Sequence, residues 1–243
     1  MKDKILNKLL IFLHIPKTGG VTLRRIIDKQ YSLDEVHEGS EQGMINRLKR
    51  DEDKLKCIQG HMKFGIHTHC SKPYTYITML REPIERVISV YYFIRRRPQN
   101  KWYDDVKNIS LKEFVSKDEF WQNNTNIQTF LLAGGERPNK ITDLFNLNNL
   151  SQAKKNLNKY FSVVGITEMF DESLVLMKQE LGWDDISYTR KNVSKNRLAK
   201  GEVEKEIIEI IRERNRLDIE LYEYVKINLI KRIESLNVKD KDN

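Results

Sequence analysis

The sequence of 243 residues has little cysteine, proline or glycine, and each shortage excludes a class of protein. Two cysteines cannot form the framework of a disulfide-stapled domain, and they suit a reducing compartment. Five prolines and eleven glycines, beside 39% hydrophobic residues, exclude a collagen-like repeat and argue against long disordered tracts. The composition therefore predicts a globular chain that is long enough to bury a core of its own.

Long hydrophobic runs are also missing. The longest apolar run near the N-terminus, Leu9–Leu13, is far shorter than the ~20 apolar residues that a membrane-spanning helix needs. No apolar stretch is followed by the small residues of a signal-peptide cleavage site. We therefore expect a cytoplasmic protein without a membrane span.

Charge is the one skewed quantity, because 43 lysines and arginines stand against 35 aspartates and glutamates, a formal net charge of +8. This balance favours anionic partners such as nucleotides, acidic glycans, nucleic acids or membrane surfaces, although a solvated basic surface is the plainer alternative. Acidic residues are interspersed among the basic ones and no nucleic-acid recognition motif occurs, so we expect no nucleic-acid partner. The oligomeric state has no signature in the sequence.

Strand-like and helix-like segments alternate, which predicts a single α/β domain with a central parallel sheet flanked by helices. Short apolar or β-branched runs predict strands at Leu9–Leu13, near 56–59, at Tyr74–Leu80 and at Phe161–Ile166. Residues 31–56 are polar and are expected to form a surface excursion, helical near 44–55. From residue 202, apolar spacing predicts one long helix or two shorter ones, before a frayed tail at 237–243.

Local signals indicate where several helices begin and end. Pro83 follows a predicted strand at once, as is typical of the first position of a helix. Ser110 and Glu113 have the spacing of a capping box. Gly134 and Gly135 end the apolar run at Ile127–Ala133 and predict a helix stop there.

The most specific chemistry lies in residues 16–20 (PKTGG), which follow the first predicted strand and precede a helix. Glycines let the backbone approach an anion, and the free N–H groups of a helix start attract negative charge. Lys17 supplies a cation, and Thr18 and Thr22 supply hydroxyl donors. A Walker loop has its lysine after the last glycine, so the spacing disfavours an ATPase or a P-loop-type kinase. Alone, the loop fits either a phosphate site or a plain strand-to-helix turn.

Residues 12–23 (FLHIPKTGGVTL) resemble the 5′-phosphosulfate-binding loop of carbohydrate sulfotransferases, which use 3′-phosphoadenosine 5′-phosphosulfate (PAPS). Residues 80–92 (LREPIERVISVYY) resemble the strand and helix of that family in which an arginine and a serine hold the 3′-phosphate. The similarity is closest to the heparan sulfate 2-O-sulfotransferase branch and extends over residues 9–225. It continues more weakly through 126–129, 164–168 and 218–222.

The resemblance implies a P-loop-like sulfotransferase fold and the transfer of a sulfuryl group from PAPS to an acceptor hydroxyl. The released product would be 3′-phosphoadenosine 5′-phosphate (PAP), and no metal is required. The implied acceptor is a glycan or a glycosylated small molecule. Val21 stands where many relatives carry Ser or Thr. The implied cofactor contacts come from Lys17, Thr18, Gly19, Gly20, Val21, Thr22, Arg81, Ser89, Asn192 and Lys195.

Two residues are candidates for catalysis. His61 lies in the segment 59–62 (QGHM), which resembles the Gly-His segment that carries the catalytic base of the 2-O branch. Imidazole exchanges protons near neutral pH, so His61 is the candidate base that accepts the proton of the acceptor hydroxyl. Lys17 is the candidate that stabilises the leaving phosphate oxygen. For His14, contact with the acceptor and packing at the strand end both remain open.

Some of these residues also allow a metal site or a nucleotide-stacking role. The run Cys57, His61, His67, His69 and Cys70 contains zinc-ligand types, but its spacing matches no zinc motif, so we predict no metal site. Aromatic residues at 91–93 are expected in the core rather than against a nucleotide base. The alternative functions are a non-catalytic nucleotide- or nucleic-acid-binding protein and a P-loop-type kinase.

Overall fold

The centre of the fold is a parallel sheet with the strand order β2-β3-β1-β4-β5. The computed structural model describes residues 8–136, 139–189 and 198–239. Every residue of β1 is buried, because this strand lies in the middle of the sheet, and this explains its uninterrupted apolar sequence. The strands, in sheet order, are β2 (Val36–Glu38), β3 (Cys57–Gly60), β1 (Leu9–Leu13), β4 (Tyr74–Leu80) and β5 (Phe161–Ile166).

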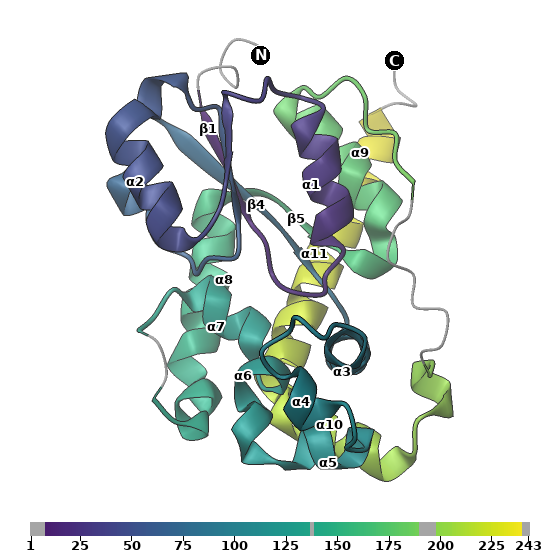
Figure 1. The fold of residues 1–243 in the computed structure, drawn as a ribbon. Coiled ribbons are helices and arrows are strands. Elements are labelled where there is room, and N and C mark those ends of the chain that lie inside the picture. The colour runs from purple at the N-terminus through teal and green to yellow at the C-terminus, as the bar shows by residue number, and fades with distance from the viewer. Residues whose placement is uncertain (1–7, 137–138, 190–197, 240–243) are drawn as a thin grey trace.

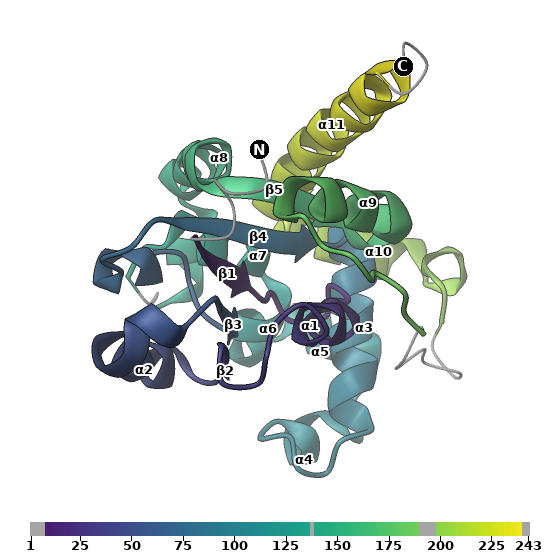
Figure 2. The same cartoon turned by 90° about the horizontal axis from the view of Figure 1, so that it is seen from above.

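Helices cover both faces of the sheet, with α1 and α9 on one side and α2 and α8 on the other (Figure 1). The last helix, α11, packs against β5, α7 and α8 and extends beyond the sheet (Figure 2). The helices are α1 (Gly20–Asp28), α2 (Glu41–Asp51), α3 (Pro83–Arg95), α4 (Tyr103–Val106), α5 (Leu111–Ser116), α6 (Trp121–Asn124), α7 (Ile127–Ala133), α8 (Leu147–Tyr160), α9 (Phe170–Leu181), α10 (Lys205–Arg214) and α11 (Arg216–Lys239).

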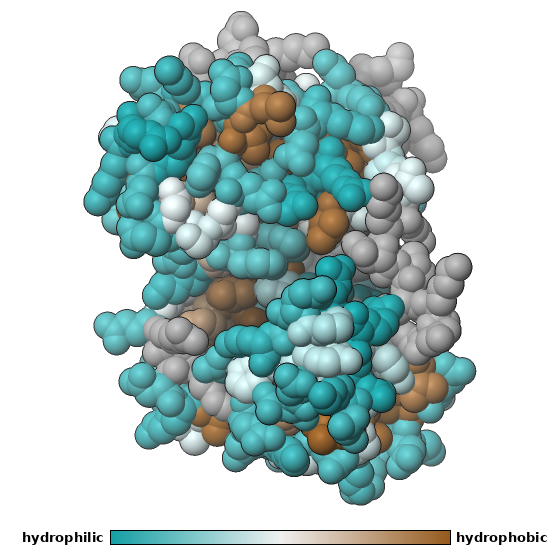
Figure 3. Space-filling view, viewed as in Figure 1, coloured by the Kyte–Doolittle hydropathy of each residue, from teal (hydrophilic) through white to brown (hydrophobic). Residues whose placement is uncertain are grey.

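Two apolar clusters form the core. The larger one surrounds the sheet, and the smaller one lies among α3, α4, α5 and α10, with Phe114 and Ile211 at its centre. Tyr91 belongs to the smaller cluster, as expected for a core residue, and its hydroxyl donates to the carbonyl of Ile109 at 2.8 Å. Figure 3 shows a hollow on one face of the molecule, between the upper part with α1 and α2 and the lower part with α3, α4 and α5.

The order of the strands places three loops together. From β1 the chain moves to one side of the sheet, forming β2 and β3, and then crosses to β4 on the other side of β1. At such a reversal the connections leave the carboxyl ends of neighbouring strands in opposite directions, which opens a crevice. The loops after β1 and β4 begin at this crevice and the loop after β3 begins next to it, and each carries a predicted site residue.

Most of the predicted elements are confirmed, and the exceptions have physical causes. The strand near 56–59 is β3, shifted by one residue, and the helix expected near 44–55 is α2, which begins earlier at Glu41. The excursion at 31–56 also contains β2, a three-residue edge strand that pairs with β3. Its sequence, Val-His-Glu, carries no apolar pattern, because none of its residues is buried.

The C-terminal region forms two helices, broken at Asn215. α11 continues to Lys239, so residues 237–239 extend this helix instead of beginning the predicted tail; residues 240–243 lie outside the described part of the chain. None of the helices within the described ranges combines the length and the apolar character needed to cross a bilayer.

Candidate active site

The loop between β1 and α1 presents backbone N–H groups to one point. Lys17 and Gly19 have positive φ values of 71° and 80°, which turn the chain sharply before α1 begins at Gly20. Within the described part of the chain, the N–H groups of residues 18–21 have no acceptor. Free N–H groups at a helix N-terminus, together with the helix dipole, form an anion site. Residues 16–21 therefore have the geometry of a phosphate-binding loop, which we call the phosphate cradle.

The hydroxyl of Thr18 has a different role from the predicted one. This side chain is fully buried, and its Oγ1 donates to the carbonyl of Ile15 at 2.8 Å. The carbonyl of Thr18 accepts from the hydroxyl of Thr167, which follows β5, at 2.9 Å. Thr18 thus fixes the loop from inside, and its backbone N–H, rather than its hydroxyl, is the group that remains for a ligand.

Thr22, half-buried on α1, lines a cavity of about 320 Å³ beside this helix. Across the cavity lie residues 187–189, the first residues of the basic loop (187–200). They are held there by Lys29, whose ammonium donates to Asp185 at 2.9 Å and to the carbonyl of Ser187 at 2.8 Å. The cavity is lined by Thr22, Arg25, Ile26, Lys29, Ser187, Tyr188 and Thr189.

The basic loop itself includes Asn192 and Lys195, which lie outside the described residues, so their predicted cofactor contacts stay predictions. Lys200, at the other end of the basic loop, lies by the start of α3. There Lys200 donates through its ammonium to Glu82 at 3.0 Å and through its N–H to Glu85 at 3.2 Å. The two flanks of the basic loop are therefore anchored at α1 and at the start of α3.

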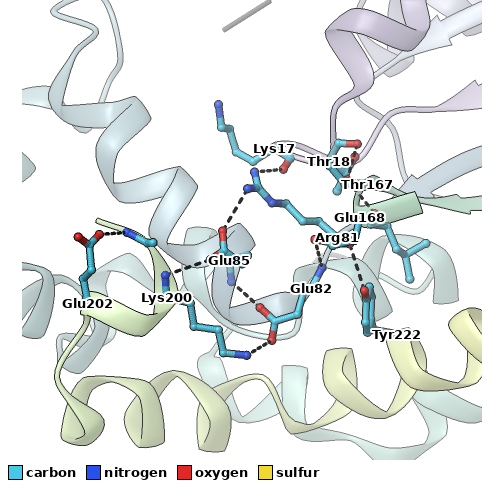
Figure 4. A network of polar contacts seen from close by, with 12 residues as sticks. Lys17, Thr18, Arg81, Glu82, Glu85, Thr167, Glu168, Lys200, Glu202 and Tyr222 are labelled. Atoms are coloured by element: carbon cyan, nitrogen blue, oxygen red, sulfur yellow. Dashed lines mark hydrogen bonds and ion pairs between the residues drawn. The ribbon is translucent and has the colours of Figure 1, made fainter. Parts of the chain in front are cut away.

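Arg81 follows β4 directly and joins two parts of the site. Its guanidinium donates to the carbonyl of Lys17 at 3.3 Å and to the carboxylate of Glu85 at 3.3 Å (Figure 4). Burial lowers the pKa of Arg81, while Glu168 and Glu82 oppose this shift. Its Nε is buried and, among the described residues, has no hydrogen-bond partner. Arg81 thus reaches the phosphate cradle with one donor still to be satisfied.

One stripe of α3 faces the loop. Residues four apart lie on the same face of a helix, so Glu85, Ser89 and Phe93 form this stripe. Glu85 meets Arg81 at one end of this stripe, and at the other the ammonium of Lys17 lies 4.2 Å from the ring centre of Phe93. Ser89 lies between them and is 5% exposed. The structure thus brings Lys17, Arg81 and Ser89 to one side of the crevice.

His61 lies at the end of β3, with an exposed side chain. Its Nδ1 is 2.8 Å from the carbonyl oxygen of His14. A carbonyl can only accept, so Nδ1 carries the proton and the lone pair of the imidazole is on Nε2. This is the tautomer that a general base needs. The ring stacks on that of His14, with centroids 4.3 Å apart.

The site contains two further groups of residues that the sequence motifs do not predict. The first is a set of carboxylates around Arg81, whose members are joined across three elements (Figure 4). Glu82 caps α3 by accepting from the N–H of Glu85 at 2.7 Å, and its own N–H donates to Glu168 at 3.2 Å. Glu168 also accepts from the hydroxyl of Tyr222 on α11 at 3.1 Å. These contacts hold the starts of α3 and α9 against α11.

The second group holds the backbone of Arg81. The amide of Gln128 accepts from the N–H of Arg81 and donates to its carbonyl, both at 2.9 Å. Asp218 on α11 in turn accepts from the N–H groups of Gln128 at 3.1 Å and Thr129 at 2.7 Å. Only the weak similarity at 126–129 and 218–222 pointed to these residues.

The sequence is similar to those of known sulfotransferases. Residues 7–225 match the profile of the Sulfotransferase family. Heparan-sulfate 6-O-sulfotransferase 2 of Danio rerio is 27% identical over 94% of this chain and 59% of the relative. Galactose-3-O-sulfotransferase 3 of Bos taurus is 30% identical over 66% of this chain and 39% of the relative. The chain thus spans less than two thirds of these relatives, and neither is a 2-O-sulfotransferase.

A solved structure supports the fold. A sulfotransferase from Alicyclobacillus acidocaldarius aligns with a TM-score of 0.50 and 14% identity, over 90% of this chain and 95% of that one. The predicted α/β sulfotransferase fold is confirmed by this match. In the described ranges, no group of three or more His, Cys, Asp or Glu side chains is arranged to hold a metal ion. Because the family profile covers most of its length, the chain belongs to the sulfotransferase family.

Proposed function

We propose that this chain transfers a sulfuryl group from PAPS to a hydroxyl of a carbohydrate. The observation that carries the proposal is the contact of His61 with the start of the phosphate cradle. Its Nδ1 lies 2.8 Å from the carbonyl oxygen of His14, two residues before the cradle begins. The lone pair of Nε2 is thereby held beside an anion site, where an acceptor hydroxyl would lose its proton. The names of the relatives, which specify heparan sulfate and galactose, support a glycan acceptor.

The residues of the crevice fit PAPS. The N–H groups of residues 18–21 suit the phosphosulfate, because they have no acceptor in the described part of the chain. Arg81 offers its unpartnered Nε, and Ser89 offers a hydroxyl on the neighbouring face of α3, to a dianionic 3′-phosphate. When bound, PAPS supplies an activated sulfuryl group and a good leaving group.

The chain's own residues then have distinct tasks. Sulfuryl transfer resembles phosphoryl transfer, in which positioning and electrostatic stabilisation do most of the catalysis. His61 takes the proton of the acceptor hydroxyl at Nε2, while its Nδ1–H stays on the carbonyl of His14. Lys17 directly precedes the N–H groups of residues 18–21, so its cation would stabilise the negative charge of the leaving phosphate held there.

The position that is sulfated belongs to the proposal as well. The segment at 59–62 favours the 2-O branch, whereas the names of the relatives specify 6-O and galactose 3-O transfer. We propose a hydroxyl of an acidic or galactose-containing glycan, because the chain carries a net charge of +8. Product analysis of each acceptor would distinguish the three positions.

The test is a transfer assay with radiolabelled PAPS and a panel of desulfated heparan sulfates and galactose-terminated oligosaccharides. We expect transfer to at least one acceptor, and a loss of about 10²-fold or more in turnover for His61→Ala. His69→Ala removes an exposed histidine outside the crevice and is the matched control. Lys17→Ala should lower turnover as well, because the leaving oxygen loses a cation.

Calorimetry separates binding from turnover. PAP should bind to wild type and to His61→Ala alike, without Mg²⁺, and more tightly than AMP or ATP. Full activity in His61→Ala would remove this residue from the role of base. Equal binding of ATP with Mg²⁺ would contradict the sulfotransferase proposal and favour a kinase.

A further inference from the structure

The ring of His14 touches three parts of the site at once. It is only 8% exposed and stacks between Phe12, at 5.4 Å between centroids, and His61, at 4.3 Å. On a third side it lies against Gly20, the first residue of α1. A Cβ atom added to Gly20 would be 2.0 Å from Cδ2 of His14, so only glycine leaves room for the ring. His14 thus spaces the base from the phosphate cradle.

The backbone of His14 holds His61 as well. Its N–H donates to the carbonyl of Gly60 at 3.0 Å, which continues the pairing of β1 with β3 beyond the strand ends. Its carbonyl then accepts from Nδ1 of His61 at 2.8 Å. The imidazole therefore serves as the last donor of the β1–β3 ladder. This contact selects the Nδ1–H tautomer of His61, and the stacked ring of His14 keeps the imidazole in the plane in which the contact is made.

The charge state of His14 suits this arrangement. The charged groups that face it are His61, Arg24 on α1 and Lys17, and burial together with these charges lowers the pKa of His14 to about 3. At neutral pH the ring is uncharged. A neutral ring can stack against His61 before and after His61 takes up a proton, whereas a second imidazolium would repel it.

We propose that His14 is the positioning residue of this site, which sets the tautomer and the orientation of His61 relative to the phosphate cradle. Its effect on turnover rests on the proposed function, but its effect on His61 does not. The ring and the carbonyl contribute separately, since the carbonyl is present whatever side chain residue 14 carries. Replacing the side chain with alanine therefore tests whether the ring is needed to orient His61. Replacing it with phenylalanine tests whether a stacked planar ring is sufficient for this.

The experiment compares His14→Ala and His14→Phe with wild type and with the control His69→Ala, all as the full chain. Long-range ¹H–¹⁵N spectra of the imidazoles report the tautomer of His61 directly. In wild type we expect the Nδ1–H form to dominate. In His14→Ala the unstacked imidazole should turn away from the carbonyl part of the time. We therefore expect a mixture of tautomers, and a fall in kcat of about 10-fold or more with the Kd for PAP within about 3-fold of wild type. His14→Phe should restore the tautomer and most of kcat.

An unchanged His61 tautomer in His14→Ala would overturn the proposal, whatever happens to turnover. If His14→Ala does not fold, Gly20→Ala provides a second route, because its Cβ displaces the ring from the opposite side. A shift in tautomer in Gly20→Ala would support the proposal, and no shift would overturn it. If no acceptor is sulfated by wild type, the proposed function fails, while the spectra still decide the role of His14.

Discussion

Single residues of the phosphate cradle hold conformations that their side chains disfavour. Lys17 has a φ of 71°, and a non-glycine residue in this left-handed region costs about 1 kcal/mol. The guanidinium of Arg81 donates to the carbonyl of Lys17, which helps to hold the turn in place. The strained residue is also the proposed electrostatic catalyst. This coincidence is common where a rigid surrounding structure places a functional group.

His14 should make the stability of the fold depend on pH. Its pKa is about 3 in the folded chain and 6.5 when unperturbed, so between these values the unfolded state binds a proton that the folded state does not. The contribution of His14 to stability is therefore complete above pH 6.5. It falls by about 1.4 kcal/mol per pH unit as the pH drops below 6.5.

The measurement is urea unfolding of wild type and His14→Phe at several pH values between 4 and 7. Phenylalanine binds no proton, so the difference between the two unfolding free energies should change steadily with pH and level off above 6.5. Taking the difference removes the contribution of the carboxylates, which titrate in both proteins. A difference that is constant over the whole range would show that His14 is not buried as a neutral ring.

At the scale of elements, the position of Arg81 depends on α7 and α11. Gln128 satisfies both backbone groups of Arg81, and Asp218 satisfies two N–H groups at the start of α7. Asp218 is fully buried, and burial raises its pKa although Arg86 and these N–H donors oppose the shift. Asp218 on α11 is thereby linked through Gln128 to the end of β4, where the 3′-phosphate is proposed to bind.

Gln128→Ala should weaken both the fold and the binding of PAP. Two backbone groups of Arg81 lose their partners, and an unsatisfied buried group costs about 1–3 kcal/mol. We expect the free energy of unfolding to fall by about 2 kcal/mol or more and the Kd for PAP to rise. Gln42→Ala, which removes an exposed glutamine of α2, is the control for both measurements. Wild-type affinity in a destabilised Gln128→Ala would show that Arg81 is held without this clamp.

The elements differ in how far their own sequences determine them. β1, β4 and β5 are predicted to the residue, because β1 is apolar and buried throughout and the other two are rich in apolar, aromatic and β-branched residues. β2 could not be predicted, since its strand conformation comes from pairing with β3 rather than from its residues. In the candidate site, motifs predict roles for Lys17, Arg81 and His61, and these roles stay predictions. The partners that hold them, His14 and Gln128, act through contacts between segments 47 residues apart, which no local pattern records.

At the scale of the whole molecule, the site lies between the two apolar clusters. The sheet cluster supports the phosphate cradle and His61, whereas α3, with Ser89 and Phe93, belongs to the smaller cluster. A ligand that contacts the cradle, Arg81 and Ser89 together would bridge both clusters. Such a ligand binds only to the folded state and must stabilise it.

PAP should therefore raise the melting temperature, and its 3′-phosphate should account for much of the rise. At 100 times its Kd, a ligand stabilises the fold by about 2.7 kcal/mol, which corresponds to about 5–10 °C in a chain of this size. AMP lacks the 3′-phosphate and should give a smaller shift at the same concentration. In Arg81→Ala, the shift caused by PAP should fall toward that caused by AMP, because the guanidinium that binds the extra phosphate is gone. Equal shifts for PAP and AMP in wild type would mean that Arg81 and Ser89 do not form a 3′-phosphate site, and that the two clusters are not bridged through them.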